Sequence, residues 1–221
     1  MKQRAYFRAA VLALSALAAT SAYADTVTFD DVPIYSNQPD FSSGGFNFAS
    51  GTWIGYVADG SYCDPACPYN GTNVFVAAIS PSALTMTSAN GGAFKFKGFD
   101  GGGSYNFNLS SDPDFVSYIP TQIDVVGLRA DGQTVSQSFL IDRSSNADGR
   151  LNLTSFAADS RFSNVLSITF SASGSSWEGL NTFTLDNIVA SAVPEPSMGY
   201  LFLAGAGLVA GAVRRRRGKA V

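Results

Sequence analysis

Three aspartates near the ends of the central region are the residues best suited to bind a metal ion. Asp30 and Asp31 follow the first predicted strand, and Asp186 lies in the last one. Calcium is bound by several hard oxygen atoms, from carboxylates and backbone carbonyls. If the first and last strands are neighbours, these carboxylates can converge on one structural calcium ion. The alternative is that the three acids only end strands or cap turns.

The two cysteines, Cys63 and Cys67, enclose the short segment Asp-Pro-Ala. An even number of cysteines in an exported chain favours a disulfide, here one that closes a small surface loop. A redox-active pair is the alternative, but the two-residue spacing and the helix that would lower a thiol pKa are both absent.

Aromatic side chains in loop-like stretches are the candidates for contacting a sugar. Trp53, Tyr56 and Trp177 lie among glycine, serine and other polar residues. The apolar face of a sugar ring can stack on such a side chain, while neighbouring Asp and Asn residues bind its hydroxyls. Packing in the core or within a loop is the alternative for each of them.

Composition excludes several classes of chemistry. The chain of 221 residues contains no histidine, which rules out a Ser-His-Asp triad and histidine-ligated zinc. The central region, residues 25–193, has 6 basic and 16 acidic residues, so its net charge is 6 − 16 = −10. Such an acidic body repels nucleic acid. A glycosidase needs a pair of carboxyl groups across a cleft, and none stands out among 15 Asp and the single Glu178. We therefore expect no enzyme, with an unusual hydrolase as the alternative.

Residues 1–24 have the three parts of a secretory signal peptide. Lys2, Arg4 and Arg8 supply the positive charge, and residues 9–19 form an apolar stretch. Ala22-Tyr23-Ala24 is a small-x-small cleavage site, so signal peptidase is expected to cut after Ala24.

Residues 194–221 combine a short motif, an apolar run and a basic cluster. Pro194-Glu195-Pro196 precedes the apolar residues 198–213, and Arg214, Arg215, Arg216 and Arg217 follow. The run is a short transmembrane helix candidate, and its arginines are expected to stay in the cytoplasm. This anchors the chain in the inner membrane with residues 25–193 outside.

The order of these three parts closely resembles the PEP-CTERM sorting signal of Gram-negative bacteria. The resemblance implies that an exosortase, an integral-membrane protease, recognises Pro194-Glu195-Pro196 and releases the protein after transient anchoring. It also implies delivery to the cell surface or the extracellular matrix of a bacterium that makes exopolysaccharide and biofilm. An ordinary membrane anchor with a chance Pro-Glu-Pro is the alternative.

The body, residues 25–193, is predicted to be all-β: an antiparallel β-sandwich, most simply a jelly roll. Alternation of apolar and polar residues, as in Phe94-Lys95-Phe96-Lys97, is typical of half-exposed strands. Ala130-Asp131-Gly132-Gln133 predicts a hairpin turn. Asp100–Ser104 is predicted to be a flexible turn, and residues 156–162 a single helical turn. Predicted strands are 26–29, 46–48, 52–57, 73–77, 83–87, 94–99, 105–109, 122–129, 134–140, 151–153, 165–171 and 183–190.

The body also resembles the jelly-roll modules of PEP-CTERM cargo proteins, which are similar in outline to carbohydrate-binding β-sandwiches. Thr28-Phe29-Asp30-Asp31-Val32 and Phe183-Thr184-Leu185-Asp186-Asn187-Ile188 carry this resemblance. It implies a structural calcium held by Asp30 or Asp31 with Asp186. The function expected is a non-catalytic module that binds extracellular polysaccharide. A structural or adhesive surface protein without a sugar ligand is the alternative.

Overall fold

Strands with alternating burial make up most of the structure, a computed structural model that describes residues 26–34, 40–50, 55–59, 67–77, 83–104, 115–145, 150–176 and 181–193. All of these residues belong to one compact unit, Tyr23–Val193. The predicted signal peptide (1–24) and the predicted sorting segment (194–221) lie outside the described residues. Within the described part of the chain, no helix is long and apolar enough to cross a membrane.

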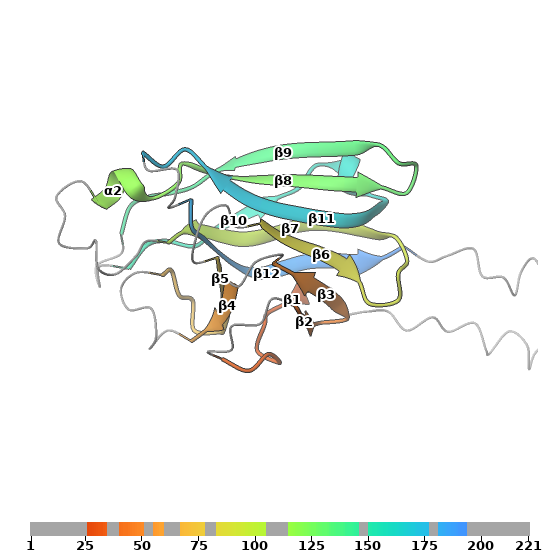
Figure 1. Cartoon of the computed structure of the whole chain (residues 1–221), viewed down its shortest axis with the longest axis horizontal. Coiled ribbons are helices and arrows are strands. Elements are labelled where there is room, and N and C mark those ends of the chain that lie inside the picture. The colour runs from red at the N-terminus through yellow and green to blue at the C-terminus, as the bar shows by residue number, and fades with distance from the viewer. Residues whose placement is uncertain are drawn as a thin grey trace, which may run out of the picture. The chain divides into compact units, whose positions relative to one another are not determined.

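The strands agree with the all-β prediction (Figure 1). They are β1 (Thr26–Val27), β2 (Asp40–Ser43), β3 (Phe46–Ala49), β4 (Gly55–Ala58), β5 (Val74–Ala77), β6 (Ala83–Ser88), β7 (Phe94–Gly103), β8 (Gln122–Arg129), β9 (Thr134–Leu140), β10 (Thr154–Ala157), β11 (Val165–Ser173) and β12 (Phe183–Ala192). The described helices are short: α2 (Phe115–Tyr118) and the 3-10 turn η3 (Ser160–Phe162).

All the strand pairs are antiparallel, and they form one continuous curled sheet. The main order is β2-β3-β6-β11-β7-β12-β5-β4, with β8 and β9 extending from β11, β10 beside β7, and β1 beside β12. The layer of β11, β8 and β9 is joined to the layer of β7 and β12 because Val165 of β11 pairs with Phe94 of β7. The two layers expected of a sandwich are therefore one sheet folded over its own core.

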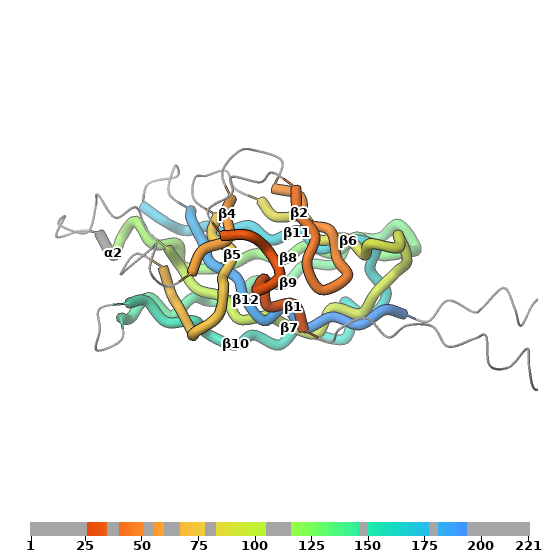
Figure 2. Tube along the Cα trace, turned by 90° about the horizontal axis from the view of Figure 1, so that it is seen from below, coloured from red at the N-terminus to blue at the C-terminus, as the bar shows by residue number. Residues whose placement is uncertain are grey.

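The first and last strands are neighbours, as the metal hypothesis required. Thr26 pairs with Val189 and Val27 with Ile188. Seen from below, β1, in red, lies beside β12 (Figure 2). The last strand is thus an interior strand of the sheet, held by β7, β5 and β1.

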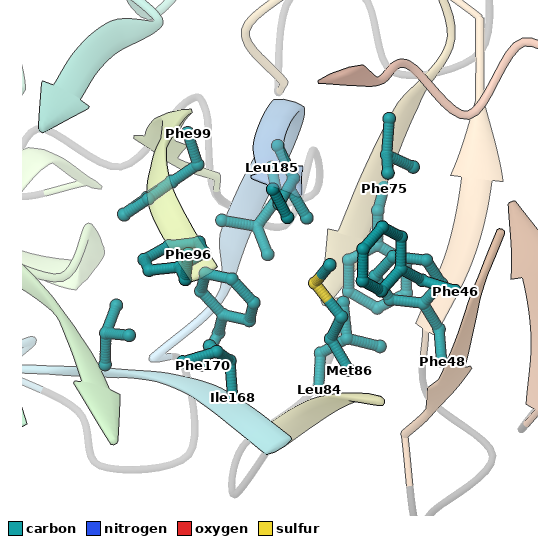
Figure 3. Packing of buried hydrophobic residues seen from close by; sticks show 14 of the residues in the cluster. Phe46, Phe48, Phe75, Leu84, Met86, Phe96, Phe99, Ile168, Phe170 and Leu185 are labelled. Carbon is teal, nitrogen blue, oxygen red and sulfur yellow. The ribbon is translucent and has the colours of Figure 1, made fainter. Parts of the chain in front are cut away.

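The core between the layers is built mainly from phenylalanine rings (Figure 3). Phe96 of β7 packs against Phe170 of β11, with ring centroids 5.7 Å apart, and against Phe162, at 5.8 Å. Phe41, Phe48 and Phe75 form a second group of rings around Phe29. Edge-to-face contacts of this kind add to the stabilisation that comes from burying apolar area.

The hairpin prediction is confirmed at Asp131-Gly132. Gly132 has a φ of 81°, in the left-handed region that glycine adopts without strain. The Arg129 amide donates to the Gln133 carbonyl at 2.8 Å, which closes the turn between β8 and β9. The pairing of Leu128 with Thr134 follows from this turn.

The prediction of a flexible turn at Asp100–Ser104 is wrong, because residues 100–103 continue β7. Their glycines let other chain segments approach the sheet: a Cβ on Gly102 would lie 2.5 Å from the Asn152 carbonyl oxygen. In the predicted helical turn at 156–162, residues 156 and 157 instead belong to β10, and only Ser160–Phe162 is helical. β2 was not predicted, and the predicted strand 105–109 lies outside the described residues.

Candidate functional site

The outer face of β12 carries two buried polar side chains, Thr184 and Asp186. Both are fully shielded from solvent, with 0% exposure. Their neighbours Phe183 and Leu185 point into the main core. Thr184 pairs with Gly102 of β7 and with Val76 of β5, and Asp186 pairs with Asp100 of β7. We call Thr184, Asp186 and the groups around them the β12 polar site.

Only one of the two carboxylate oxygens of Asp186 accepts hydrogen bonds from other side chains. Its Oδ2 accepts from Asn70 Nδ2 at 2.7 Å and from Thr72 Oγ1 at 2.8 Å. Its Oδ1 is buried without a hydrogen-bond partner, as is Oγ1 of Thr184. An unsatisfied buried oxygen is costly and indicates a missing partner such as an ion or a water molecule.

Burial raises the pKa of the Asp186 carboxyl above its ordinary value. The hydrogen bonds from Asn70 and Thr72 act in the opposite direction, because they stabilise the ionised form. The negative charge of nearby Asp30 adds to the rise. A cation bound between Asp186 and Asp30 would offset both the cost of burying the Asp186 charge and its repulsion by Asp30.

The structure places Asp30 and Asp31 in different surroundings, although they are adjacent in sequence. Asp30 accepts from the Asn73 amide at 2.9 Å, beside the segment that contacts Asp186. Asp31 instead accepts from the Ser43 hydroxyl, and from the Gly44 amide at 3.3 Å. Asp30 is therefore brought to the β12 polar site, while Asp31 ties the N-terminal segment to the β2–β3 turn.

Left-handed backbone flanks both acids of the site. Phe29, just before Asp30, has a φ of 59°, and Asn187, just after Asp186, has a φ of 45°. A phenylalanine in this region is an outlier that the surrounding rings hold in place. Asn187 donates to Asp100 Oδ2 at 2.8 Å, where the β12–β7 register shifts. These two positions set the direction of the backbone at Asp30, in the turn after β1, and at Asp186, in β12.

A small apolar cluster covers the same face of the sheet. Cys67 packs with Ala58, Val74 and Val76, and half-buried Tyr56 and Leu153 lie against them. Cys67 is disulfide-bonded, whereas Cys63, its predicted partner, lies outside the described residues. Tyr56, proposed above as a sugar contact, is placed here as a packing residue. Trp53 and Trp177 lie outside the described residues.

The candidate ligands for calcium are fewer than predicted. Asp186 and Asp30 contribute carboxylates, whereas Asn70 and Thr72 present an amide nitrogen and a hydroxyl group that donate hydrogen bonds to Asp186. No group of three or more acidic, cysteine or histidine side chains positioned for a metal ion occurs among the residues that the structure describes. Asn70 and Thr72 were missed at the sequence level, because nothing in Asn70-Gly71-Thr72 marks it as lying beside Asp186.

Several other carboxylates connect neighbouring strands or cap turns. Asp124 accepts from Gln122, Ser138 and Ser173, which joins β8, β9 and β11. Asp100 accepts from Ser155 and Asn187, which joins β7 to β10 and β12. Arg161 holds the pKa of Asp159 below its usual value through a side-chain hydrogen bond. Each is engaged as a strand connector or turn cap.

The body ends directly at the predicted sorting segment. The Val193 amide donates to the Ala93 carbonyl at 3.0 Å, and Pro194, which has no amide hydrogen to donate, comes next. The Pro-Glu-Pro sequence thus follows the last described hydrogen bond of the sheet without a spacer.

Comparison with solved structures shows distant similarity in fold to carbohydrate-binding modules. TmCBM61 in complex with β-1,4-galactotriose has a TM-score of 0.38 and 10% identity, over 73% of this chain and 99% of that chain. The CBM22-1–GH10 modules of a Clostridium thermocellum xylanase with xylohexaose have a TM-score of 0.36 and 10% identity, over 79% of this chain and 29% of that chain. A DUF4465 family protein from Bacteroides ovatus has a TM-score of 0.36 and 11% identity, over 78% of this chain and 99% of that chain.

The sequence matches none of the curated proteins with which it was compared. A family model for the PEP-CTERM protein-sorting motif matches residues 192–217. The match begins at Ala192, the last residue of β12, and takes in Pro194-Glu195-Pro196 and the four arginines. The chain therefore carries a PEP-CTERM sorting motif at the end of its all-β body, which implies processing by an exosortase and, as for PEP-CTERM proteins generally, export and sorting to the cell surface.

Proposed function

We propose that this protein is a non-catalytic module of the cell surface or extracellular matrix that binds extracellular polysaccharide. The observation that carries the proposal is the sorting motif, which delivers the body to the compartment where such polymers are found. Signal peptidase cuts after Ala24, the inner membrane holds the chain transiently, and an exosortase then processes it near Pro194–Pro196.

The way the carboxylates are used supports a non-catalytic role. A glycosidase needs one carboxyl group as an acid and a second as a base or nucleophile, facing each other across a cleft. In the described part of the body, Asp100, Asp124 and Asp142 are occupied by hydrogen bonds from neighbouring side chains. Asp186, whose pKa is raised, is fully buried and out of reach of a polymer.

The test is binding of the full-length chain, in a detergent without a sugar head group, to exopolysaccharide purified from the producing strain. We expect saturable binding and no release of reducing ends on prolonged incubation. Reducing ends that increase with time, and whose release stops when one aspartate is replaced, would establish a hydrolase instead. Absence of binding by a folded sample would favour a structural or adhesive role without a sugar ligand.

We further propose that the β12 polar site holds a structural calcium ion. Asp186 and Asp30 would bind it, with Asn70 and Thr72 as neutral neighbours. The support is Oδ1 of Asp186, which is fully buried and has no hydrogen-bond partner of normal geometry, although the Asn187 backbone amide lies close enough to lower the pKa of this carboxyl. Bound calcium would supply the missing positive charge and so fix the N-terminal segment against β12.

Calcium is expected to raise the melting temperature of the wild type and not that of Asp186→Asn. At 100 times its dissociation constant a ligand stabilises a protein by about 2.7 kcal/mol, or about 5–10 °C for a body of this size. Without calcium, the variant should melt at or above the wild-type temperature, because it buries no unpaired charge. Thermal denaturation with calcium and with a chelator measures both effects.

Asp31→Asn is the matched control for this experiment. It removes a carboxylate next to Asp30 that is bound to Ser43 and Gly44 and lies away from Asp186. We expect it to keep the full calcium-dependent increase. An equal increase in Asp186→Asn and in the wild type would rule out calcium at this site.

A further inference from the structure

One face of the sheet carries a regular array of small hydroxyl side chains. In β6 and β11, Leu84, Met86 and Ile168 are fully buried, while the residues that alternate with them face outward. The outward residues at the centre are Thr85 and Thr87 of β6, Ser167 and Thr169 of β11, and Val126 and Leu128 of β8. We call these six residues and their in-register neighbours the hydroxyl face.

The strand register arranges these side chains in rows across the sheet. One row runs through Thr85, Thr169, Val126 and Ser136, and the next through Thr87, Ser167, Leu128 and Thr134. The hydroxyls of Thr85 and Thr169 lie 3.1 Å apart, which places both side chains on the same face. Neighbouring strands are about 4.8 Å apart, and alternate residues along a strand about 6.8 Å. The face is therefore a closely spaced array of hydroxyls on a rigid support.

The face also offers apolar contacts between the hydroxyls. Val126 and Leu128 are each 41% exposed, and Leu140, on β9, is 75% exposed. Threonine contributes a methyl group beside its hydroxyl. A surface that alternates hydroxyls with methyl groups matches a sugar chain, whose rings present hydroxyl edges and C–H faces. Aromatic stacking is not required for such a contact, although each contact is weaker without it.

The face is close to neutral on a strongly acidic body. Among the residues of β6, β8, β9 and β11 that are not buried, Asp124 and Arg129 are charged, and Arg129 forms an ion pair with Asp131 at 3.3 Å. The Asp124 oxygens accept from Gln122 at 2.7 Å, Ser138 at 2.5 Å and Ser173 at 2.7 Å, so Asp124 orders its neighbours. The body carries 6 basic and 16 acidic residues, a net charge of −10. This net charge opposes binding of a polyanion or of a second copy of the body, whereas an uncharged polymer is not repelled.

We propose that the hydroxyl face is the binding surface for a neutral polysaccharide. This inference rests on the proposed function and adds to it the site and the charge class of the ligand. The sugar hydroxyls exchange hydrogen bonds with the Thr and Ser side chains, and the C–H faces lie on Val126, Leu128 and the threonine methyl groups. Binding depends weakly on salt, because no ion pairs form.

The test compares the full-length wild type with two variants of the face. Thr85→Val with Thr169→Val removes two hydroxyls and keeps the β-branched shape that suits a strand. Thr169→Glu adds a charge to the centre of the array. Ser160→Glu, at an exposed position in η3 between β10 and β11, adds the same charge outside the strands that form the face. Galactan, xylan and dextran serve as neutral probes and alginate as the anionic probe, with binding measured by calorimetry.

We expect the wild type to bind at least one neutral probe and not alginate. The double valine variant should bind about tenfold more weakly, Thr169→Glu should lose measurable binding, and Ser160→Glu should bind as the wild type does. Melting temperatures within a few degrees of the wild type show that the variants are folded. Two variants that perturb the face differently keep the test informative if one fails to fold.

Four results would overturn the inference. Wild-type binding that both face variants retain would place the ligand elsewhere and leave the proposed function intact. Binding to alginate alone would contradict the neutral ligand class. Light scattering that shows a dimer lost in Thr169→Glu would identify the face as a contact between copies. A wild type that binds no polysaccharide, the host's included, would end the proposed function together with this inference.

Discussion

Replacing Pro194, Glu195 and Pro196 by alanine is expected to keep the full-length protein in the membrane fraction and to abolish its release. The family match covers residues 192–217, and these three residues form its Pro-Glu-Pro element. Proline restricts its own φ and disfavours the helical conformation of the residue before it, and it donates no amide hydrogen bond, which suits a segment that must enter a protease. Alanine carries none of these restrictions. Immunoblots of membrane and culture fractions measure the outcome.

Ser191→Ala is the control for the sorting experiment. Ser191 is half-buried near the end of β12, next to the motif but outside the Pro-Glu-Pro element. Its release should match the wild type. The triple variant should also melt at the wild-type temperature, because the sheet's last described hydrogen bond comes from Val193. Unchanged release of the triple variant would contradict the role of the motif.

Phe96→Ala is expected to cause the largest loss of stability in the body. Phe96 is 1% exposed and contacts the rings of Phe99, Phe162 and Phe170. Truncating a buried phenylalanine costs about 3–5 kcal/mol, because the transfer energy is lost and a cavity remains. Domains of this size are stable by about 5–15 kcal/mol, so the variant should melt about 6–20 °C lower.

Leu140→Ala tests whether burial is the cause of this loss. Leu140 lies in β9 with 75% of its surface exposed. Its truncation removes apolar atoms that are already in water, so the melting temperature should change by no more than a degree or two. A similar loss in both variants would mean that the ring cluster does not dominate the stability of the body.

The strands and the hairpin could be predicted because they depend on neighbouring residues. The alternation in Phe94-Lys95-Phe96-Lys97 puts the rings on one side of β7, and β8 and β9 were predicted with the bounds that the structure has. Asp131-Gly132 specifies a turn through the φ that glycine permits. The residues 100–103 were assigned wrongly, because glycines favour a turn locally, whereas packing of the 152 segment against Gly102 keeps them in the sheet.

The candidate metal site could be predicted only in part. Asp30 and Asp186 could be identified, because Asp30 closely follows the first strand and Asp186 lies in the last one. Their companions could not, since Asn70 and Thr72 lie 116 and 114 residues from Asp186 along the chain. The separation of Asp30 from Asp31 was equally hidden. Both lie in the turn that follows β1, and only the contacts of this turn with Asn73 and with the β2–β3 turn decide which carboxylate meets β12.

The sequence by itself determined the C-terminal sorting motif, the acidic charge of the body and the all-β class, because each is encoded in composition or in residues close together in the chain. Tertiary structure alone decided which carboxylates meet, that the two layers join as one curled sheet, and that the outward threonines of β6 and β11 share one face. The physical reason is register. Side chains alternate along every strand, so which residues become neighbours depends on the alignment of strands that lie far apart in sequence.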